Sequence, residues 1–367
     1  MSSKPTTCRG CPLETLGTGF IGTHGSGSSG ILFVGEAPGK DELGPKRPFV
    51  GKAGRLLDRL LYRLGTTQDV HIVDNVIRCR PPGNELSGAA YEAGAVAHCS
   101  PHLDETVRST TPKVIVALGG SALKRVSGVS PITRYRGFVL DSHWPGIPVV
   151  ATYHPSFLLP RRGSLAGAKH MGTVLRDIRM AMAIASTGFE RPPTCYLVDP
   201  ELAVVEHHFT RWAQRPPSWL AFDIETNYKS RKEATTGIVP DERITRIAFS
   251  DGRGFGLTMP FEGDYIAYAR SLLQRPNLRT VGWNSRTFDI PRLRTLGGMN
   301  VPLEHHYDGM DMFHTLLPNV NKGLEFAASY GCPHLRPWKH LSKSDMGLYS
   351  CIDVDATVTL AAWLEGQ

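Results

Sequence analysis

The sequence predicts an α/β protein of two domains, and two observations carry this prediction. The chain has 367 residues, which is more than one domain of ordinary size usually holds. In its first half, apolar strand-like segments alternate with amphipathic helical segments, as is typical of a parallel sheet with helices on both faces. We place a first domain at 1–185, a linker rich in Pro, Gly and Ser/Thr at 186–194, and a second domain at 195–367.

The elements of the first half follow one another in a regular order. Buried strands are expected within 30–39, 70–79, 113–126 and 147–156, and helices at 52–65 and 165–185, from their apolar spacing. Ligands of such sheets bind beyond the carboxyl ends of the strands. The turn Gly35-Glu36-Ala37, together with Asn75 and His154, falls at these ends, so these residues are expected to converge.

The second half begins with a different arrangement. A strand at 219–226 ends in carboxylates, a hairpin is expected at 244–260 through the Asp-Gly turn, and a further strand at 279–284. Helical patterns fill the remainder, up to a long helix near the C-terminus at 342–366.

Composition excludes several classes of protein. Hydrophobic residues make up 41% and charged residues 20%, as in globular proteins. There is no apolar run of membrane-spanning length and no signal-peptide pattern, so a cytoplasmic location is expected. Residues 1–188 hold 22 Lys and Arg against 13 Asp and Glu, a net charge of +9, and the rest carries −2. A basic first half suits a domain that binds phosphates.

Four cysteines in the first hundred residues suggest a metal site. Cys8 and Cys11 form a CRGC pair, and Cys79 and Cys99 flank a Pro-rich loop. Four thiolates accept either zinc or an iron–sulfur cluster, so the residues alone leave that choice open. The other cysteines, Cys195, Cys332 and Cys351, are expected to be ordinary buried residues.

These cysteines, the segment GEAPGKDELGPKRPFVGKAG and the motif TYHPS together resemble the family 4 uracil-DNA glycosylases. The resemblance covers about 180 residues and implies a three-layer α/β/α glycosylase fold. It also implies a [4Fe–4S] cluster on the cysteines, with a structural role near DNA.

The resemblance assigns a uracil site. Uracil would stack on Phe49, Asn75 would read its N3–H and O4, and His154 would donate a hydrogen bond to O2 as the base leaves. Gly35, Glu36 and Ala37 form the turn where the water is activated in related enzymes. Ala37 stands where the best-known family has Asp, so no general base is evident, and Glu36 either orders the water or crowds C5.

The segment FLLPRR after this motif is expected to contact DNA. Leu158 and Leu159 would fill the vacated base stack, and Arg161 and Arg162 would meet phosphates.

The second half holds a set of acidic residues suited to two-metal phosphodiester hydrolysis. Asp223 and Glu225 lie two apart on a strand and so share a face, and Asp289 begins a helix. Asp353 lies one helical turn after Tyr349 on the last helix. An all-oxygen site of this kind prefers Mg²⁺ or Mn²⁺.

The motifs FDIET, NSRTFD and YSCID resemble those of DEDDy 3′–5′ exonucleases, over about residues 193–367. The likeness is greatest to the proofreading domains of phage-like family A DNA polymerases. It implies an RNase H-like domain with a mixed sheet, two metal ions on Asp223, Glu225, Asp289 and Asp353, and a Tyr349 that orients the attacking water. Asp308 and Asp311 are expected to be structural.

The sequence therefore predicts a monomeric DNA-repair or replication enzyme that excises uracil and degrades DNA from 3′ ends. Its partners would be DNA and, if phage-encoded, a separate polymerase in the host cytoplasm; no membrane is expected. Three alternatives remain: a uracil-DNA sensor with one inactive domain, a protein that traps uracil-DNA covalently, and a zinc-stabilised nuclease. The covalent route is disfavoured because the loop GNELSGAAYEAG lacks a basic, His-containing insertion.

Overall fold

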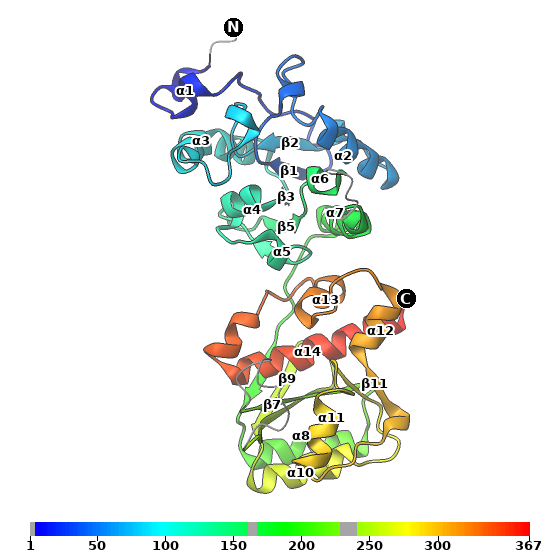
Figure 1. Ribbon diagram of the computed structural model, residues 1–367. Coiled ribbons are helices and arrows are strands. Elements are labelled where there is room, and N and C mark those ends of the chain that lie inside the picture. Colours follow the sequence, from blue (N-terminus) through cyan, green and yellow to red (C-terminus); the bar gives the residue numbers. More distant parts are fainter. Residues whose placement is uncertain (1–3, 161–166, 228–240) are drawn as a thin grey trace. The chain divides into compact units, whose positions relative to one another are not determined.

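The chain forms two compact units, Met1–Glu190 and Arg191–Gln367, in a computed structural model that describes residues 4–160, 167–227 and 241–367 (Figure 1). Each unit is described by itself. The predicted linker at 186–194 spans the boundary, and the helix before it, α7 (Met171–Thr187), runs two residues into that range. No helix among the described residues is long and apolar enough to cross a membrane.

The first unit is built on a five-stranded sheet in the order β2-β1-β3-β5-β4. Its strands are β1 (Ile31–Gly35), β2 (Ile72–Asn75), β3 (Val114–Leu118), β4 (Val139–Asp141) and β5 (Pro148–Thr152). All neighbours run parallel except β4, which pairs antiparallel with β5. The predicted α/β class is confirmed, but the antiparallel edge strand β4 was not expected, because three residues carry too little pattern to be recognised.

Helices cover both faces of this sheet. Residues of α2 (Lys52–Arg63) and α7 share one apolar core with Phe33, Val73, Val116 and Val150. The opposite face carries α3 (Glu92–Thr110) and α4 (Gly120–Ser127). Shorter helices complete the unit: α1 (Leu13–Leu16), α5 (Ile132–Tyr135), α6 (Pro155–Leu158), η1 (Thr6–Cys8), η2 (Lys40–Glu42), η3 (Gln68–Val70), η4 (Pro82–Asn84) and η5 (Ala168–His170). The result is the predicted three-layer α/β/α arrangement.

An N-terminal arm runs along the outer edge of this sheet. Thr18 and Arg80 form an antiparallel bridge, as do His24 and Val73, and the Ile21 amide donates to the Arg78 carbonyl. The arm thus pairs with the edge strand β2 and the residues after it, which would otherwise expose unpaired backbone groups.

The second unit has a six-stranded mixed sheet in the order β11-β10-β7-β8-β9-β6. Its strands are β6 (Cys195–Val198), β7 (Leu220–Thr226), β8 (Ile244–Ser250), β9 (Phe255–Pro260), β10 (Thr280–Gly282) and β11 (His306–Asp308). The predicted hairpin is confirmed, since β8 and β9 pair antiparallel. Strand β6, which pairs parallel with β9, was not recognised from its sequence.

Two apolar cores hold helices against this sheet. One joins α8 (Leu202–Gln214), α10 (Gly263–Leu273) and α11 (Asp289–Thr295) to one face, and the other joins α14 (Met346–Glu365) to the opposite face (Figure 1). The remaining helices are α12 (Gly309–Leu316), α13 (Leu324–Gly331), η6 (Leu303–His305) and η7 (Lys339–Lys343).

Candidate functional sites

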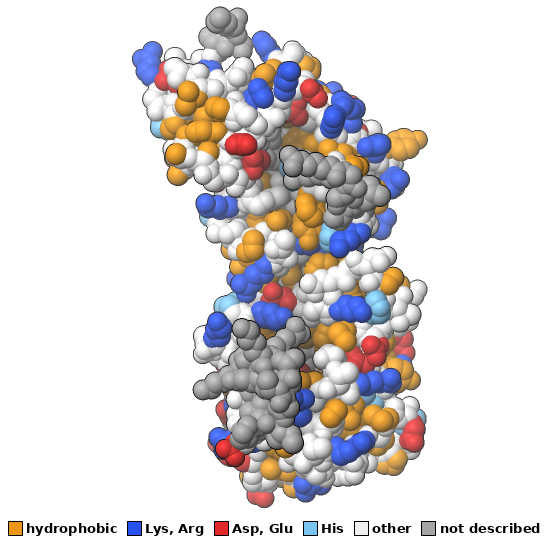
Figure 2. All heavy atoms as spheres, viewed as in Figure 1, with side chains coloured by type: hydrophobic (Ala, Val, Ile, Leu, Met, Phe, Trp, Pro, Cys, Tyr) orange, Lys and Arg blue, Asp and Glu red, His pale blue; other side chains and the backbone are white. Residues whose placement is uncertain are grey.

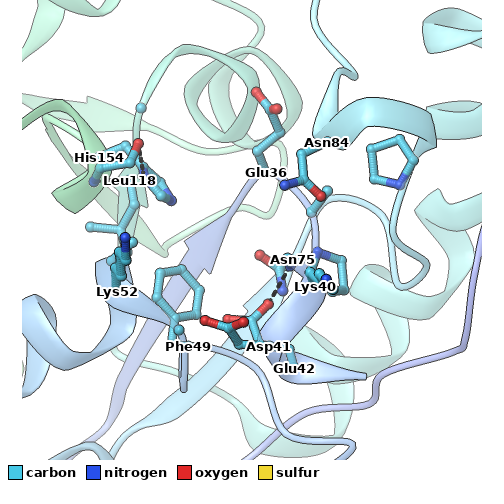
Figure 3. A pocket seen from close by; sticks show the side chains of 18 of the residues that line it. Glu36, Lys40, Asp41, Glu42, Phe49, Lys52, Asn75, Asn84, Leu118 and His154 are labelled. Atoms are coloured by element: carbon cyan, nitrogen blue, oxygen red, sulfur yellow. Dashed lines mark hydrogen bonds between the residues drawn. The ribbon is translucent and has the colours of Figure 1, made fainter. Parts of the chain in front are cut away.

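The first cavity lies where three strands of the first unit end. Strands β1, β2 and β5 end at or just before Gly35, Asn75 and His154. Glu36, Ala37, Phe49, Asn75 and His154 line one cavity of about 460 Å³ (Figure 3). The convergence follows from topology, because parallel strands bring their carboxyl ends to one edge of the sheet.

Phe49 and Asn75 are packed together over a glycine. A β-carbon at Gly35 would lie 2.5 Å from Asn75 Oδ1 and 2.5 Å from Phe49 Cζ, so only glycine leaves room for both side chains. The Phe49 backbone has a positive φ of 56°, which is unusual for an aromatic residue. Its ring centroid lies 5.8 Å from that of His154. An aromatic face, an amide and an imidazole therefore meet in one small volume.

The tautomer of His154 follows from its neighbours. The backbone N–H of Ser156 lies 3.1 Å from His154 Nδ1, and the Ser156 hydroxyl lies 2.8 Å from the same atom. Because a backbone N–H can only donate, Nδ1 accepts, and the proton of the neutral ring is on Nε2. His154 thus presents a neutral donor at the other end of its ring.

Glu36 is held by a side chain that sequence reasoning did not identify. Its Oε2 accepts a hydrogen bond from Ser121 Oγ in the first turn of α4. The end of β3 and its glycines, Leu118-Gly119-Gly120, also line the cavity. The strand-end rule would have found them, since β3 lies between β1 and β5. Further polar residues that were not among the predicted site residues also line the cavity: Lys40, Asp41, Glu42, Lys52, Asn84 and Ser156.

The two predicted wedge residues differ in exposure, and their contact with DNA stays a prediction. Leu158 is 3% exposed and belongs to the apolar core. Leu159 is half-buried, and Phe157 is the exposed apolar side chain of α6, at 43%. Arg161 and Arg162 lie outside the described residues. Elsewhere, basic side chains are spread over the visible face rather than gathered in one patch (Figure 2).

The four cysteines of the first unit are brought together from separate segments. Cys8 ends η1, Cys11 precedes α1, Cys79 follows β2 and Cys99 lies in α3, and all four are buried and unoxidised. Burial raises the pKa of the Cys79 thiol to about 11 and that of Cys99 to about 12, and the other thiols of the group add to both shifts. Four neighbouring buried thiols repel one another when ionised, so they suit a group that supplies positive charge.

A second cavity, in the second unit, is acidic. Carboxylate oxygens of Asp223, Glu225 and Asp353 lie within 4.8 Å of one another, in a cavity of about 750 Å³. Strand β7 supplies the first two, and α14, which packs on one face of the sheet, supplies Asp353. Three oxygen ligands at this spacing suit a divalent cation such as Mg²⁺ or Mn²⁺.

Asp289 and Tyr349 line the same cavity, as predicted. Asp289 is not one of the close trio, and its Oδ1 accepts from the Ile224 N–H at 2.9 Å. Burial, and next the negative charge of Asp353, raise the Tyr349 pKa above its usual range, so the hydroxyl stays protonated.

Burial also raises the pKa of every carboxyl in the group. The values reach about 8 for Glu225, about 7 for Asp289 and about 6 for Asp353, and Asp223 is raised well above its usual range. Mutual repulsion adds to burial at Asp223 and Glu225. The donor set therefore fits a cation, whose charge would stabilise the ionised carboxylates.

Of the two aspartates expected to be structural, Asp308 holds such a position, whereas Asp311 is exposed on α12. Asp308 caps α12 by accepting from the Met310 N–H at 3.0 Å, and it also accepts from the Asn284 N–H at 2.9 Å. Cys332 and Cys351 are buried, whereas Cys195 is exposed and was wrongly expected to be buried. Trp338 donates a hydrogen bond to Asp353 and was not among the predicted site residues, because nothing in RPWKH alone indicates a contact with a distant helix.

Comparisons with known proteins identify relatives of the first unit and of a larger part of the chain. Residues 23–179 match the model of the Uracil DNA glycosylase superfamily. A type-4 uracil-DNA glycosylase of Thermotoga maritima is 37% identical over 188 residues, which cover 49% of this chain and 91% of the relative. A DNA polymerase of Bacillus phage SP01 is 22% identical over 300 residues, 74% of this chain and 31% of the polymerase.

Among solved structures, a Trypanosoma brucei RNase D complex with RNA U12 is similar to 48% of this chain, with 17% identity and a TM-score of 0.38. The match covers 64% of the RNase D chain, slightly less than two thirds.

Proposed function

Since the chain belongs to the type-4 uracil-DNA glycosylase family, we propose that it excises uracil from DNA with its first unit and shortens DNA from 3′ ends with its second. The observation that carries the first activity is the convergence of Phe49, Asn75 and His154 in one cavity. The second activity rests on the carboxylate trio beside Tyr349.

The first cavity offers each edge of an extruded uracil a partner. The Phe49 ring provides a stacking face, which is worth about 1–3 kcal/mol per base. The Asn75 amide both accepts and donates, as the N3–H and O4 of uracil require. A base that lacks this pattern would leave the buried amide unpaired, which is costly.

Bond cleavage develops negative charge on the departing uracil. The Nε2–H of His154 is a fixed, neutral donor for O2, because the Ser156 backbone holds the other ring nitrogen. A preorganised donor aimed at developing charge is a strong catalytic contribution. With Ala37 at the turn, stabilisation of the leaving group carries most of the rate.

Two roles for Glu36 remain as alternatives: ordering the attacking water or crowding C5. An E36A variant that begins to excise thymine would favour crowding, because it removes the bulk of the side chain. An E36Q variant that keeps the bulk but loses turnover of uracil would favour the water.

We further propose that the four cysteines hold a [4Fe–4S] cluster, which the burial of four neighbouring thiols supports. The cluster would tie the N-terminal arm to the loop between Cys79 and Cys99. A brown protein with broad visible absorption is expected, and a colourless, zinc-containing protein would contradict the proposal.

In the second unit, Asp223, Glu225 and Asp353 would bind divalent cations, with Asp289 completing the ligand set. When bound, Mg²⁺ or Mn²⁺ supplies an activated water and neutralises charge on the leaving oxygen. Tyr349, which is protonated and lines the same cavity as Asp353, would orient that water.

One experiment tests both activities. A 5′-labelled single-stranded oligonucleotide with one central uracil is incubated with the protein in EDTA or in Mg²⁺, then separated on a denaturing gel with and without alkali. An alkali-dependent break at uracil in EDTA, and a ladder shortening from the 3′ end only in Mg²⁺, are expected. An intact strand in EDTA plus alkali would overturn the glycosylase proposal, and the lack of a ladder in either Mg²⁺ or Mn²⁺ would overturn the exonuclease proposal.

The similarity to a phage DNA polymerase supports a polymerase as a partner. Pull-down from cells that encode both proteins tests this, and recovery of no polymerase would count against it. The cytoplasmic location and the monomeric state stay predictions.

A further inference from the structure

One buried tryptophan joins the acidic cavity to a neighbouring segment. Trp338 is 2% exposed, lines the cavity, and donates its indole Nε1–H to Asp353 Oδ1. The indole N–H is a donor only, so Oδ1 of the carboxylate must be the acceptor. This contact comes from the residue just before η7, whereas Asp353 lies on α14.

Such a contact matters because a carboxylate on its own is poorly oriented. The terminal torsion of an aspartate is broad, so either oxygen can face a ligand unless a second contact selects one. At Asp353, the Trp338 indole donates to Oδ1, and Tyr349, one helical turn earlier on α14, acts on the same carboxylate electrostatically. The indole hydrogen bond is therefore the contact that selects the orientation of this group.

Trp338 is itself held in place by a carboxylate. Oε2 of Glu325, in the first turn of α13, accepts from the backbone N–H groups of Trp338 and Lys339 at 2.8 Å and 2.7 Å. The indole is thus fixed at its backbone as well as at its ring nitrogen. The connection runs from α13 through Trp338 to the carboxylate trio.

A tryptophan bonded to a carboxylate can also be a purely structural pair, and the same unit offers two comparisons. Trp212 Nε1 donates to Asp251 Oδ2 at 2.7 Å, and Trp219 Nε1 donates to Glu365 Oε2 at 2.9 Å. Neither Asp251 nor Glu365 belongs to the trio, and neither lines the acidic cavity. Trp338 differs in that its partner does both.

We propose that Trp338 is a positioning residue of this cavity: its indole N–H fixes the Asp353 carboxylate and so decides which oxygen Asp353 presents to a divalent cation. The inference rests on the proposed metal site of the second unit. It assigns no part in the reaction to the indole itself, which acts through Asp353.

The test measures cation binding directly. In the full chain, W338F keeps a ring in the space and removes the N–H, and W212F makes the same change at a carboxylate partner away from the cavity. Mn²⁺ binding by isothermal titration calorimetry is expected to weaken about 10-fold or more in W338F, as is typical when a partner of a metal ligand is lost. The W212F variant is expected to match the wild type.

A second variant keeps the proposal testable if W338F does not fold, as judged by circular dichroism. Glu325 also lines the acidic cavity, so E325A is compared with E325Q: both remove its charge, and only E325Q keeps an acceptor for the two backbone N–H groups. Mn²⁺ binding should be weaker by about three-fold or more in E325A than in E325Q, less than the loss that deleting the indole N–H causes. Folded W338F that binds Mn²⁺ within two-fold of wild type would overturn the proposal, as would an equal loss in W212F. With W338F unfolded, an E325A variant that matches E325Q would do the same.

Failure of the proposed function is distinguishable from failure of this inference. A wild type that binds Mn²⁺ but cleaves no DNA, with weakened binding in W338F, would remove the exonuclease and leave the positioning role in place. A wild type that degrades DNA, together with a W338F variant that binds Mn²⁺ normally, would keep the exonuclease proposal and remove the positioning role of Trp338.

Discussion

At the scale of single residues, the uracil cavity depends on what is missing as much as on what is present. Gly35 brings no side chain to the point where Phe49 and Asn75 meet, and Gly54 brings none to the Phe49 carbonyl, which a β-carbon would approach to 1.7 Å. Both glycines allow close contacts rather than turns. The positions of Phe49 and Asn75 therefore depend on the space that Gly35 and Gly54 leave free.

A G35A variant is expected to lose about 100-fold in uracil excision, because its methyl group displaces both side chains and small misplacements have effects of this size. Rates of alkali-dependent cleavage at uracil measure the loss. The control is G44A, where a β-carbon meets nothing within 4 Å. Equal rates for G35A and wild type would contradict the geometry, and the Mg²⁺-dependent nuclease of the same chain should be unchanged.

His71 makes the stability of the first unit depend on pH. Its ring is buried, lies 2.6 Å from Ser29 Oγ and 3.1 Å from Thr66 Oγ1, and burial lowers its pKa to about 4. The unfolded chain, with a histidine pKa near 6.5, therefore binds the proton first as pH falls. Stability is present above about pH 6.5 and is lost progressively as pH falls towards 4.

The expected consequence is a free energy of unfolding that falls by about 2 kcal/mol more in wild type than in H71Q between pH 7 and pH 5. Urea unfolding at both pH values, followed by circular dichroism, measures the difference. His306 and His334 are shared by both proteins, so they cancel in the comparison. Parallel pH dependences would show that His71 is not neutral and buried in the folded state.

At the scale of elements, helix α14 is seated directly on the sheet of the second unit. A β-carbon at Gly256 of β9 would lie 2.6 Å from the carbonyl oxygen of Cys351 and 2.9 Å from its Cα. The close approach sets the depth of the helix, and the same helix carries Tyr349 and Asp353. The contact of Gly256 with Cys351 thus helps to set the positions of Tyr349 and Asp353 in the acidic cavity.

G256A should therefore destabilise the second unit by about 1–3 kcal/mol and reduce Mg²⁺-dependent degradation, because the helix must shift to admit a methyl group. Thermal unfolding and gel assays of DNA shortening measure the two effects. G252A, where a β-carbon meets nothing within 4 Å, is the matched control. A G256A protein with normal stability and normal nuclease activity would contradict this account.

How much the sequence predicted also differs by element. Strand ends and motif residues were identified because parallel sheets bring such ends together, which placed Asn75 and His154 correctly in one cavity. Contacts between distant segments, such as Trp338 with Asp353 and Ser121 with Glu36, carry no local signal. The burial of Leu158 likewise depends on packing against helices far along the chain, which a motif does not specify. Short edge strands such as β4 have too few residues to show a period.

At the scale of the whole molecule, the two units have separate cores and separate candidate metal groups. A ligand that binds only the folded form of one unit stabilises that unit by mass action. Divalent cations should therefore act on the second unit alone.

Calorimetry of the full chain is expected to show two transitions, with Mn²⁺ raising only one of them. At a Mn²⁺ concentration of 100 times the dissociation constant, the free energy of unfolding of the second unit should rise by about 2.7 kcal/mol. D223N, which removes one carboxylate of the trio, should abolish the Mn²⁺-dependent rise in transition temperature. D264N removes a carboxylate on α10, outside the cavity, and should retain that rise. An equal shift of both transitions would contradict independent units.

The N-terminal arm covers a strand edge of the first unit that would otherwise be exposed. The same arm that carries Cys8 and Cys11 also pairs with β2 and the residues after it through Thr18, Ile21 and His24. If the thiol site releases the arm, a strand edge becomes available to other chains, and free edges favour self-association. Loss of the proposed iron–sulfur cluster, by iron starvation or oxidation, would then be expected to lower the solubility of the protein before it lowers base excision.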